Sequence, residues 1–309
     1  LAISFIRNDS WMIGALIFAN IVQAIAFAFS RPANKAIITE LVEKDELVLY
    51  NSRLELVMQV VSVSSPVLSF LVLQFASLRI TLVLDALSFF LAFGLVALLP
   101  KKEEKTLGEK KLTFKVIFSD IKEGVHYIVK QKEIFFLLVM ASSVNFFFAA
   151  FNYLLPFSNQ LYGVQGSYAT ILTMGAIGSI VGALLASKIK ASMEILLFLL
   201  ALTGLGVMIM GFTLPSYLAF SGNFICELFM TIFNIHFFTQ VQTKVDGEYL
   251  GRVLSSIYTL AILFMPIATG LMTWLPSVHL YSFLIIGLGV VALSFLALGY
   301  VRTHFKKEI

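Results

Sequence analysis

The chain has 309 residues, of which 59% are hydrophobic and only 13% are charged. Soluble globular domains carry about 25% charged residues, so this composition and a mean hydropathy of +0.92 exclude a water-soluble fold. The net charge of +4 does not indicate a nucleic-acid interface, because the basic residues are not gathered in one patch. The chain has a single cysteine, Cys226, which lies in an apolar run. One cysteine cannot form a disulfide within the chain, so a disulfide framework is excluded.

Long apolar runs follow one another along the whole chain. A bilayer core of about 30 Å requires roughly 20 helical residues. Runs of this length predict helices, because only helices or closed barrels satisfy backbone polar groups in lipid. We therefore expect an all-α membrane protein with nine transmembrane helices, at 11–30, 47–75, 79–99, 134–157, 168–187, 195–213, 216–240, 253–275 and 280–301.

Basic residues gather on one side of the predicted membrane. Of the 22 Lys and Arg residues, all except Arg7 and Arg79 fall in segments on this side. Cytoplasmic loops are enriched in Lys and Arg, so this side is predicted to be cytoplasmic. We expect a multi-pass protein of the cell membrane with its C-terminus in the cytoplasm.

The charged segment 100–133 divides the chain. Before it, residues 1–99 form the remainder of an N-terminal helical bundle, and after it residues 134–309 form a six-helix C-terminal bundle. The segment begins as a solvated linker and then becomes periodic. Its apolar residues recur at helical spacing, which predicts an amphipathic helix on the cytoplasmic face. They are Phe114, Ile117, Ile121, Val125 and Ile128.

A six-residue pattern, V-[DE]-x-[DE]-x-L, occurs at 42–47 and again at 245–250. Each copy precedes a predicted helix that contains a proline far from its ends, Pro66 or Pro266. This placement predicts a parallel repeat of six-helix halves. The nine spans would then be helices 4–12 of an expected twelve in an N-terminally truncated sequence, the whole protein having about 400 residues. A native nine-span protein is the alternative.

Several segments share their order and spacing with one known family. They read RPANKA at 31–36, NS at 51–52, DALSF at 85–89, DIKEGV at 120–125 and EYLGRV at 248–253. Together they resemble the major facilitator superfamily and, within it, the macrolide-efflux-like drug exporters. The resemblance implies a secondary active transporter that exports amphipathic small molecules, such as macrolide-like drugs, by alternating access and proton antiport.

Polar residues recur on single faces of four predicted helices. A transporter needs a solute cavity near the bilayer midplane, and these stripes are its candidate lining. Interhelical hydrogen bonding explains any single amide equally well. The substrate-cavity candidates are Asn20, Gln23, Glu55, Gln59, Asn145, Asn152, Asn223, Thr231 and Asn234.

Two acids are candidates for proton or substrate coupling. Glu227 stands about eleven residues into its predicted span, where a charge costs several kcal/mol. We hypothesise that it binds substrate or proton; the alternative is a permanently protonated, hydrogen-bonded acid. Asp85 belongs to the DALSF segment but lies toward the outer end of its helix near Arg79, which favours an ion pair or outer gate.

Small and aromatic residues carry weaker signals. Gly178 and Gly182 form a G-x-x-x-G pattern, which predicts close helix contact. Three consecutive phenylalanines face different directions around one predicted helix, so at most two of them can face a cavity for large apolar compounds. They are Phe146, Phe147 and Phe148.

Other function classes find little support. The sequence lacks the glycine-rich loop followed by Lys-Ser/Thr that binds nucleotide phosphates. It also lacks the Ser/His, paired-Asp or metal-ligand groups that an intramembrane enzyme would need. No segment resembles the re-entrant selectivity filter of a channel. We expect no enzyme activity, no cofactor, no metal and no nucleic-acid partner; the partners are an amphipathic small molecule, protons and the bilayer. Two alternatives stay open: a non-transporting truncated remnant of such an exporter, and a transporter of siderophore- or lipid-like cargo.

Overall fold

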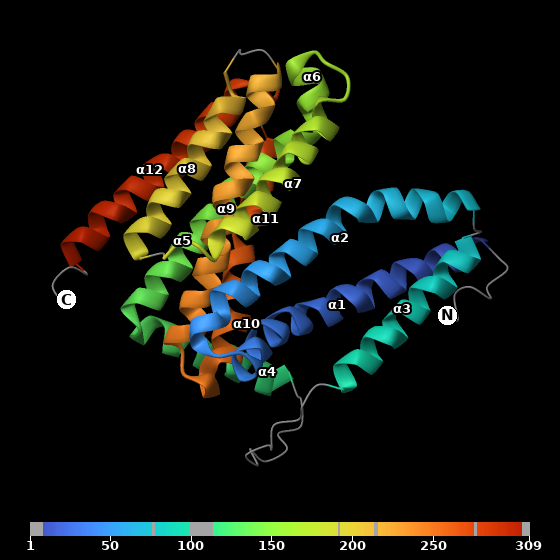
Figure 1. Ribbon diagram of the computed structural model, residues 1–309, viewed down its shortest axis with the longest axis horizontal. Helices are drawn as coiled ribbons and strands as arrows, with labels where there is room; N and C mark the ends of the chain where they lie inside the picture. The colour runs from blue at the N-terminus through green and yellow to red at the C-terminus, as the bar shows by residue number, and fades with distance from the viewer. Residues whose placement is uncertain are drawn as a thin grey trace. The chain divides into compact units, whose positions relative to one another are not determined.

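The computed structural model is helical in all its regular elements (Figure 1). Among the described residues, eight helical segments are long and apolar enough to cross a membrane. The remaining expected span, 47–75, is formed by α2 (Leu47–Phe75). The all-α membrane class is therefore confirmed. The residues described are 9–75, 78–98, 114–190, 192–212, 216–274 and 277–304.

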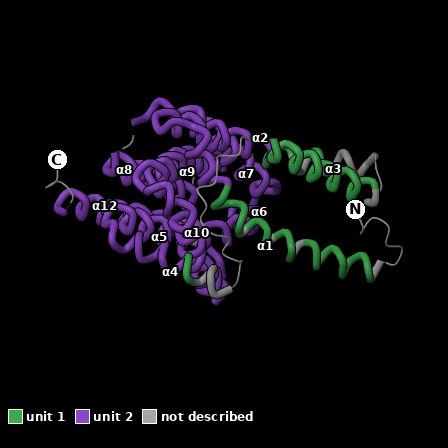
Figure 2. Tube along the Cα trace, turned by 90° about the horizontal axis from the view of Figure 1, so that it is seen from below, with its two compact units in different colours: residues 1–33, 62–120 green, residues 34–61, 121–309 purple. Residues whose placement is uncertain are grey.

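The chain divides into two compact units, which Figure 2 distinguishes by colour. Unit 1 comprises residues 1–33 and 62–120. It holds most of α1 (Asp9–Leu41), the second part of α2, and α3 (Leu78–Ala97). Large apolar side chains on these helices are open to the surroundings, including Trp11 at 75% and Phe93 at 73% exposure. Such surfaces suit contact with lipid rather than with water.

Unit 2 comprises residues 34–61 and 121–309 and contains a helical bundle. In this bundle α9 packs against α7 and α8, and α8 packs against α12. Phe151, Phe233 and Phe283 are among its fully buried side chains. Its main helices are α5 (Lys132–Leu154), α7 (Ser167–Ala186), α8 (Met193–Met210), α9 (Ser216–Lys244), α10 (Gly247–Leu263), α11 (Met265–Thr273) and α12 (Tyr281–His304).

Glycines permit the closest helix contacts in unit 2. A Cβ added to Gly182 of α7 would lie 2.5 Å from the carbonyl oxygen of Leu228 in α9, and one added to Gly178 would meet the carbonyl of Phe224. The predicted contact through the G-x-x-x-G pattern is thus confirmed. Backbones this close allow van der Waals packing that any larger residue would prevent.

Prolines interrupt two expected spans. The predicted helix 253–275 is broken at Phe264 into α10 and α11, and Pro266 stands in the first turn of α11. Likewise α5 ends at Leu154, and Pro156 lies in a short 3₁₀ turn before α6 (Ser158–Tyr162). Proline lacks an N–H and clashes with the preceding helical turn, which explains both breaks.

The two copies of the repeated pattern have the same local conformation. In the first, the amide N–H of Val42 donates to Ile38 O and that of Glu46 to Glu43 O; in the second, Val245 and Tyr249 make the corresponding bonds to Val241 O and Asp246 O. The final leucine of each copy, Leu47 or Leu250, is buried. The similarity is established for these turns, and the larger repeat stays a prediction.

The predicted amphipathic helix is α4 (Phe114–Lys130). From residue 121 onward it packs on α10: Ile128 is fully buried, and Gly124 lies against the carbonyl of Arg252. Tyr127 stacks on Tyr249 with 4.9 Å between ring centroids. Two of the segments that carried the family resemblance, 120–125 and 248–253, therefore lie against each other.

Candidate functional site

Glu227 of α9 lies against α7 in the interior of unit 2. Its Oε2 atom accepts a hydrogen bond from Ser179 Oγ at 3.3 Å. Gly175 of α7 leaves the room for this arrangement, because a Cβ there would approach Asn223 Nδ2 and come within 3.1 Å of Glu227 Cγ. The absence of a side chain at one position of α7 thus admits two polar side chains from α9. We call Glu227, Ser179 and Asn223 the α7–α9 site.

Asn223 stands one helical turn before Glu227 and is 2% exposed. Its Nδ2 atom donates to Ile171 O at 2.8 Å. Its Oδ1 atom is buried and, within the described part of the chain, accepts no hydrogen bond. Buried acceptors without partners are uncommon in native proteins, so this oxygen can receive a hydrogen from a ligand or from a neighbouring group that becomes protonated.

A second acid on α2 acts on this site. Glu55 Oε1 accepts a hydrogen bond from Gln59 Nε2 at 2.8 Å, which confirms that these residues share a helix face. Its charge interacts with Glu227 and also with Lys35 at the end of α1. The charge state of Glu227 is therefore coupled electrostatically to Glu55 of α2.

The other predicted residues occupy several places. Thr231 is 4% exposed and packs against Gly182 of α7, while Asn234 is half-buried further along α9. On α5, Asn145 is half-buried and Asn152 is exposed.

Three candidates belong to unit 1. Gln23 of α1 and Asp85 of α3 are exposed. Asn20 lies within α1, and its side chain is outside the described residues, as is that of Arg79, the expected partner of Asp85. Among the predicted residues that the structure describes in unit 2, Asn223 and Glu227 lie together against α7, next to Gly175.

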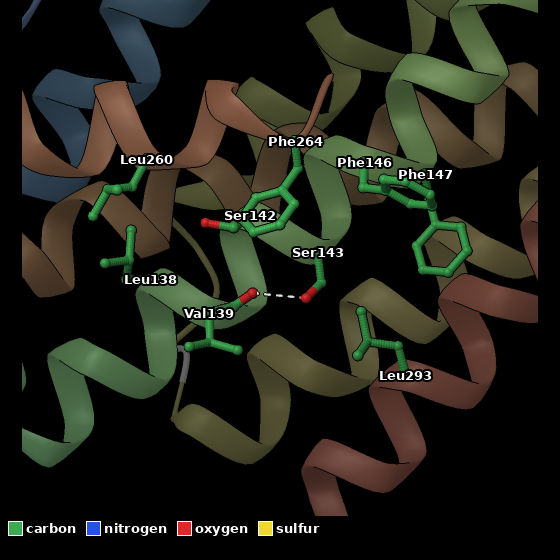
Figure 3. A pocket seen from close by; sticks show the side chains of 9 residues that line it. All are labelled: Leu138, Val139, Ser142, Ser143, Phe146, Phe147, Leu260, Phe264 and Leu293. Atoms are coloured by element: carbon green, nitrogen blue, oxygen red, sulfur yellow. Dashed lines mark hydrogen bonds between the residues drawn. The ribbon is translucent and has the colours of Figure 1, made fainter. Parts of the chain in front are cut away.

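An apolar pocket of about 390 Å³ opens between α5, the α10–α11 break and α12 (Figure 3). Two hydroxyl groups line it, those of Ser142 and Ser143, and Ser143 Oγ donates to the carbonyl of Val139 at 2.9 Å. Phe146 and Phe147 both line the pocket and Phe148 does not, in agreement with the prediction that at most two of these rings face a cavity. The lining is Leu138, Val139, Ser142, Ser143, Phe146, Phe147, Leu260, Phe264 and Leu293.

Sequence reasoning missed a buried polar network at the ends of α1, α2 and α9. Asn51, 1% exposed, donates from Nδ2 to Gln242 Oε1 at 2.7 Å and to Thr239 Oγ1 at 3.1 Å. Its Oδ1 atom accepts from Lys35 Nζ at 3.2 Å. These residues stand near predicted loops, where polar side chains are ordinary, so no periodicity distinguished them. We call Lys35, Asn51, Thr239 and Gln242 the α2–α9 contact.

These helices define a multi-pass α-helical membrane protein, with an acid and an apolar pocket among its helices. The chain belongs to the Major Facilitator Superfamily, whose family profile matches residues 1–269. The predicted family is thereby confirmed.

Within this family, the chain is similar in sequence to proteins named for macrolide efflux. The chain is 26% identical over 271 residues to Macrolide efflux protein A of Enterococcus faecalis, an alignment that covers 83% of the chain and 80% of the relative. It is also 26% identical over 270 residues to Macrolide efflux protein A of Streptococcus pyogenes, of which it spans 64%. No solved structure matches the chain.

Proposed function

We propose that this protein is a secondary active exporter of amphipathic small molecules of the macrolide type, driven by proton antiport. The similarity to proteins named for macrolide efflux supports the cargo. Alternating access is the general mechanism of secondary transporters with repeated helical halves. The residues proposed to take part come from the polar stripes, with Glu227 as the coupling group.

The observation that carries the proposal is the position of Glu227. It is the twelfth of 29 residues in α9, about 17 Å from the start of the helix at 1.5 Å per residue. An ionisable residue at this depth marks an ion or substrate pathway by default. Ser179 and Glu55 act on it from other helices. Asn223 Oδ1, which accepts no hydrogen bond from the described residues, offers an acceptor for the proton that Glu227 would carry.

The apolar pocket is the proposed place for the apolar part of the cargo. Its walls are mostly Leu, Val and Phe, and its hydroxyl groups on α5 supply hydrogen bonds without charge. Small-molecule pockets have this composition, with few polar groups that fix orientation. One wall contains the α10–α11 break, and interrupted helices recur at transport sites.

Orientation is proposed from the charged end of unit 2. Lys244 at the end of α9 pairs with Glu133 at the start of α5, and Arg302 in α12 lies 3.8 Å from Glu194 in α8. Four helix ends therefore share one end of the bundle, and two of them, those of α9 and α12, carry the basic residue of each pair. By the positive-inside rule this end faces the cytoplasm in the cell membrane, together with the C-terminus. The proposed division is 1–99, a linker at 100–133 and a bundle at 134–309.

The test uses the purified protein in proteoliposomes with an imposed pH gradient. Uptake of a radiolabelled macrolide is measured with and without an ionophore that collapses the gradient. We expect Glu227→Gln to abolish the gradient-driven component. The matched control is Glu194→Gln, which removes a carboxylate at the helix end and should transport normally.

Three results are decisive. Gradient-driven uptake by the Glu227→Gln protein equal to that of the wild type would overturn the role of the acid. Wild-type uptake that is indifferent to the ionophore would overturn proton antiport. No uptake by any version would favour another cargo or a non-transporting protein.

A further inference from the structure

Gly289 of α12 lies against one aromatic wall of the apolar pocket. A Cβ added to Gly289 would come within 2.8 Å of Phe147 Cζ and 3.2 Å of Phe147 Cδ1, and the third near atom, Cε1, belongs to the same ring. The ring therefore occupies the space that a side chain at position 289 would fill. Phe147 is one of the residues that line the pocket (Figure 3), so a glycine outside the lining touches one of its walls.

Helical spacing places this contact at the edge of the pocket. Leu293 stands one turn after Gly289 on α12, and Ser143 stands one turn before Phe147 on α5. Residues four apart share a helix face, and both Leu293 and Ser143 line the pocket. The faces of α5 and α12 that meet at the Phe147 ring are thus the same faces that border the pocket.

The surroundings of the Phe147 ring determine where it can move. The side chain packs against both of the larger apolar clusters of unit 2. Its ring also meets the Phe146 ring edge to face, with 5.5 Å between centroids. Protein interiors are close-packed, so these neighbours leave little room on their sides. The pocket of about 390 Å³ is the open space that the ring borders, and a methyl group at position 289 would displace the ring into it.

This displacement is cheaper than a displacement of backbone. A Cβ added to Gly287, two residues before Gly289, would lie 2.6 Å from the carbonyl oxygen of Gly204 in α8, so those helices would have to separate. At Gly289 the nearest atoms are instead the far end of a side chain, which moves by small rotations about its χ angles. Substitution of Gly289 therefore changes the shape of the pocket rather than the packing of the helices.

We infer that Gly289 is a positioning residue for specificity: it leaves Phe147 room to lie against α12 and so sets the size of the apolar group that the pocket accepts. The inference rests on the proposed function, in which the pocket holds the apolar part of the cargo. One methylene more or less in an apolar pocket changes discrimination between substrates by about 10–200-fold, so the place taken by one ring decides which apolar groups fit.

The first experiment measures the size of the pocket without measuring transport. Ser143→Cys in a Cys226→Ala protein places the sole thiol in the pocket lining. N-methylmaleimide and N-pyrenylmaleimide then label it as a small and a bulky probe. We expect Gly289→Ala to slow the bulky probe about tenfold and to leave the small probe unchanged. The control is Gly299→Ala in the same helix, where a Cβ would meet nothing within 4 Å, and neither rate should change.

Truncation of the ring should have the opposite effect. Phe147→Leu removes the ring end that Gly289 contacts, so the bulky probe should label faster than in the wild type, and adding this change to Gly289→Ala should restore the lost rate. The control is Phe148→Leu, because Phe148 lies outside the pocket lining.

The truncation adds no atom to the core, so it also decides the matter where Gly289→Ala fails to fold. An unchanged bulky-probe rate in folded Gly289→Ala, or in Phe147→Leu, would overturn the inference. Equal slowing of both probes by Gly289→Ala would overturn it as well, because a smaller pocket excludes by size.

Transport then tests whether the size of the pocket matters for the cargo. In the proteoliposome assay, Gly289→Ala should raise the KM for the radiolabelled macrolide about tenfold with kcat unchanged, since the lost contact serves ground state and transition state alike. A lower kcat at unchanged KM would contradict a role in specificity. The labelling rates do not depend on transport, so a protein that moves no macrolide contradicts the proposed function, while labelling without a size effect contradicts the role of Gly289.

Discussion

Replacing Gly182 by alanine tests whether α7 and α9 are held at backbone contact. The added Cβ would lie 2.5 Å from Leu228 O and 3.1 Å from Thr231 Cβ. The first neighbour is a helix backbone atom that cannot rotate away, so the helices must separate. Overpacking of this kind costs about 1–3 kcal/mol, and alanine regains roughly 0.5–1 kcal/mol over glycine inside a helix. We expect a net loss of up to about 2 kcal/mol in unfolding free energy.

Gly299 in α12 supplies the control, because a Cβ there would meet nothing within 4 Å. Gly299→Ala should therefore gain roughly 0.5–1 kcal/mol. Thermal unfolding in detergent compares the two variants, and 1 kcal/mol corresponds to roughly 2–4 °C in Tm for large domains. Two identical chemical changes should thus move Tm in opposite directions. A Gly182→Ala protein as stable as Gly299→Ala would refute the close contact.

Three further substitutions test other features. Asn223→Leu removes the unpaired buried Oδ1 together with one hydrogen bond, so thermal unfolding should show a change below about 1 kcal/mol; a larger loss would mean that this oxygen has a partner. Pro266→Ala restores an N–H at the α10–α11 break, and circular dichroism should show more helix while efflux falls; unchanged efflux would deny the break a role. Glu123→Gln breaks a 3.0 Å ion pair with Arg252 that is partly exposed and should cost at most about 1 kcal/mol in the same unfolding assay.

The helices were predictable because lipid imposes a simple rule on sequence. Runs of about 20 apolar residues must be helical, and the expected span 47–75 coincides with α2. The prediction missed the break at Phe264, although it placed Pro266 inside this span, because a single proline in a transmembrane helix can be absorbed as a kink or can divide the helix. Packing against neighbouring helices decides between these outcomes.

The candidate site was predictable only in part. The i, i+4 spacing of Asn223 and Glu227 placed both on one face of α9, and the structure brings α7 to that face. The spacing could not identify Ser179 as the partner, because serine is common in membrane helices and bonds most often to its own backbone. The α2–α9 contact escaped because Asn51 and Gln242 are about 190 residues apart in sequence and become neighbours only through tertiary packing.

The break between α10 and α11 has a consequence for how selective the pocket can be. Leu260 lies on α10, and Phe264 stands at the joint itself. Because the joint already lacks one backbone hydrogen bond, a change in the angle between the two segments breaks few others. We therefore expect one wall of the pocket to move as a unit, and a pocket with such a wall would adjust to molecules of different width.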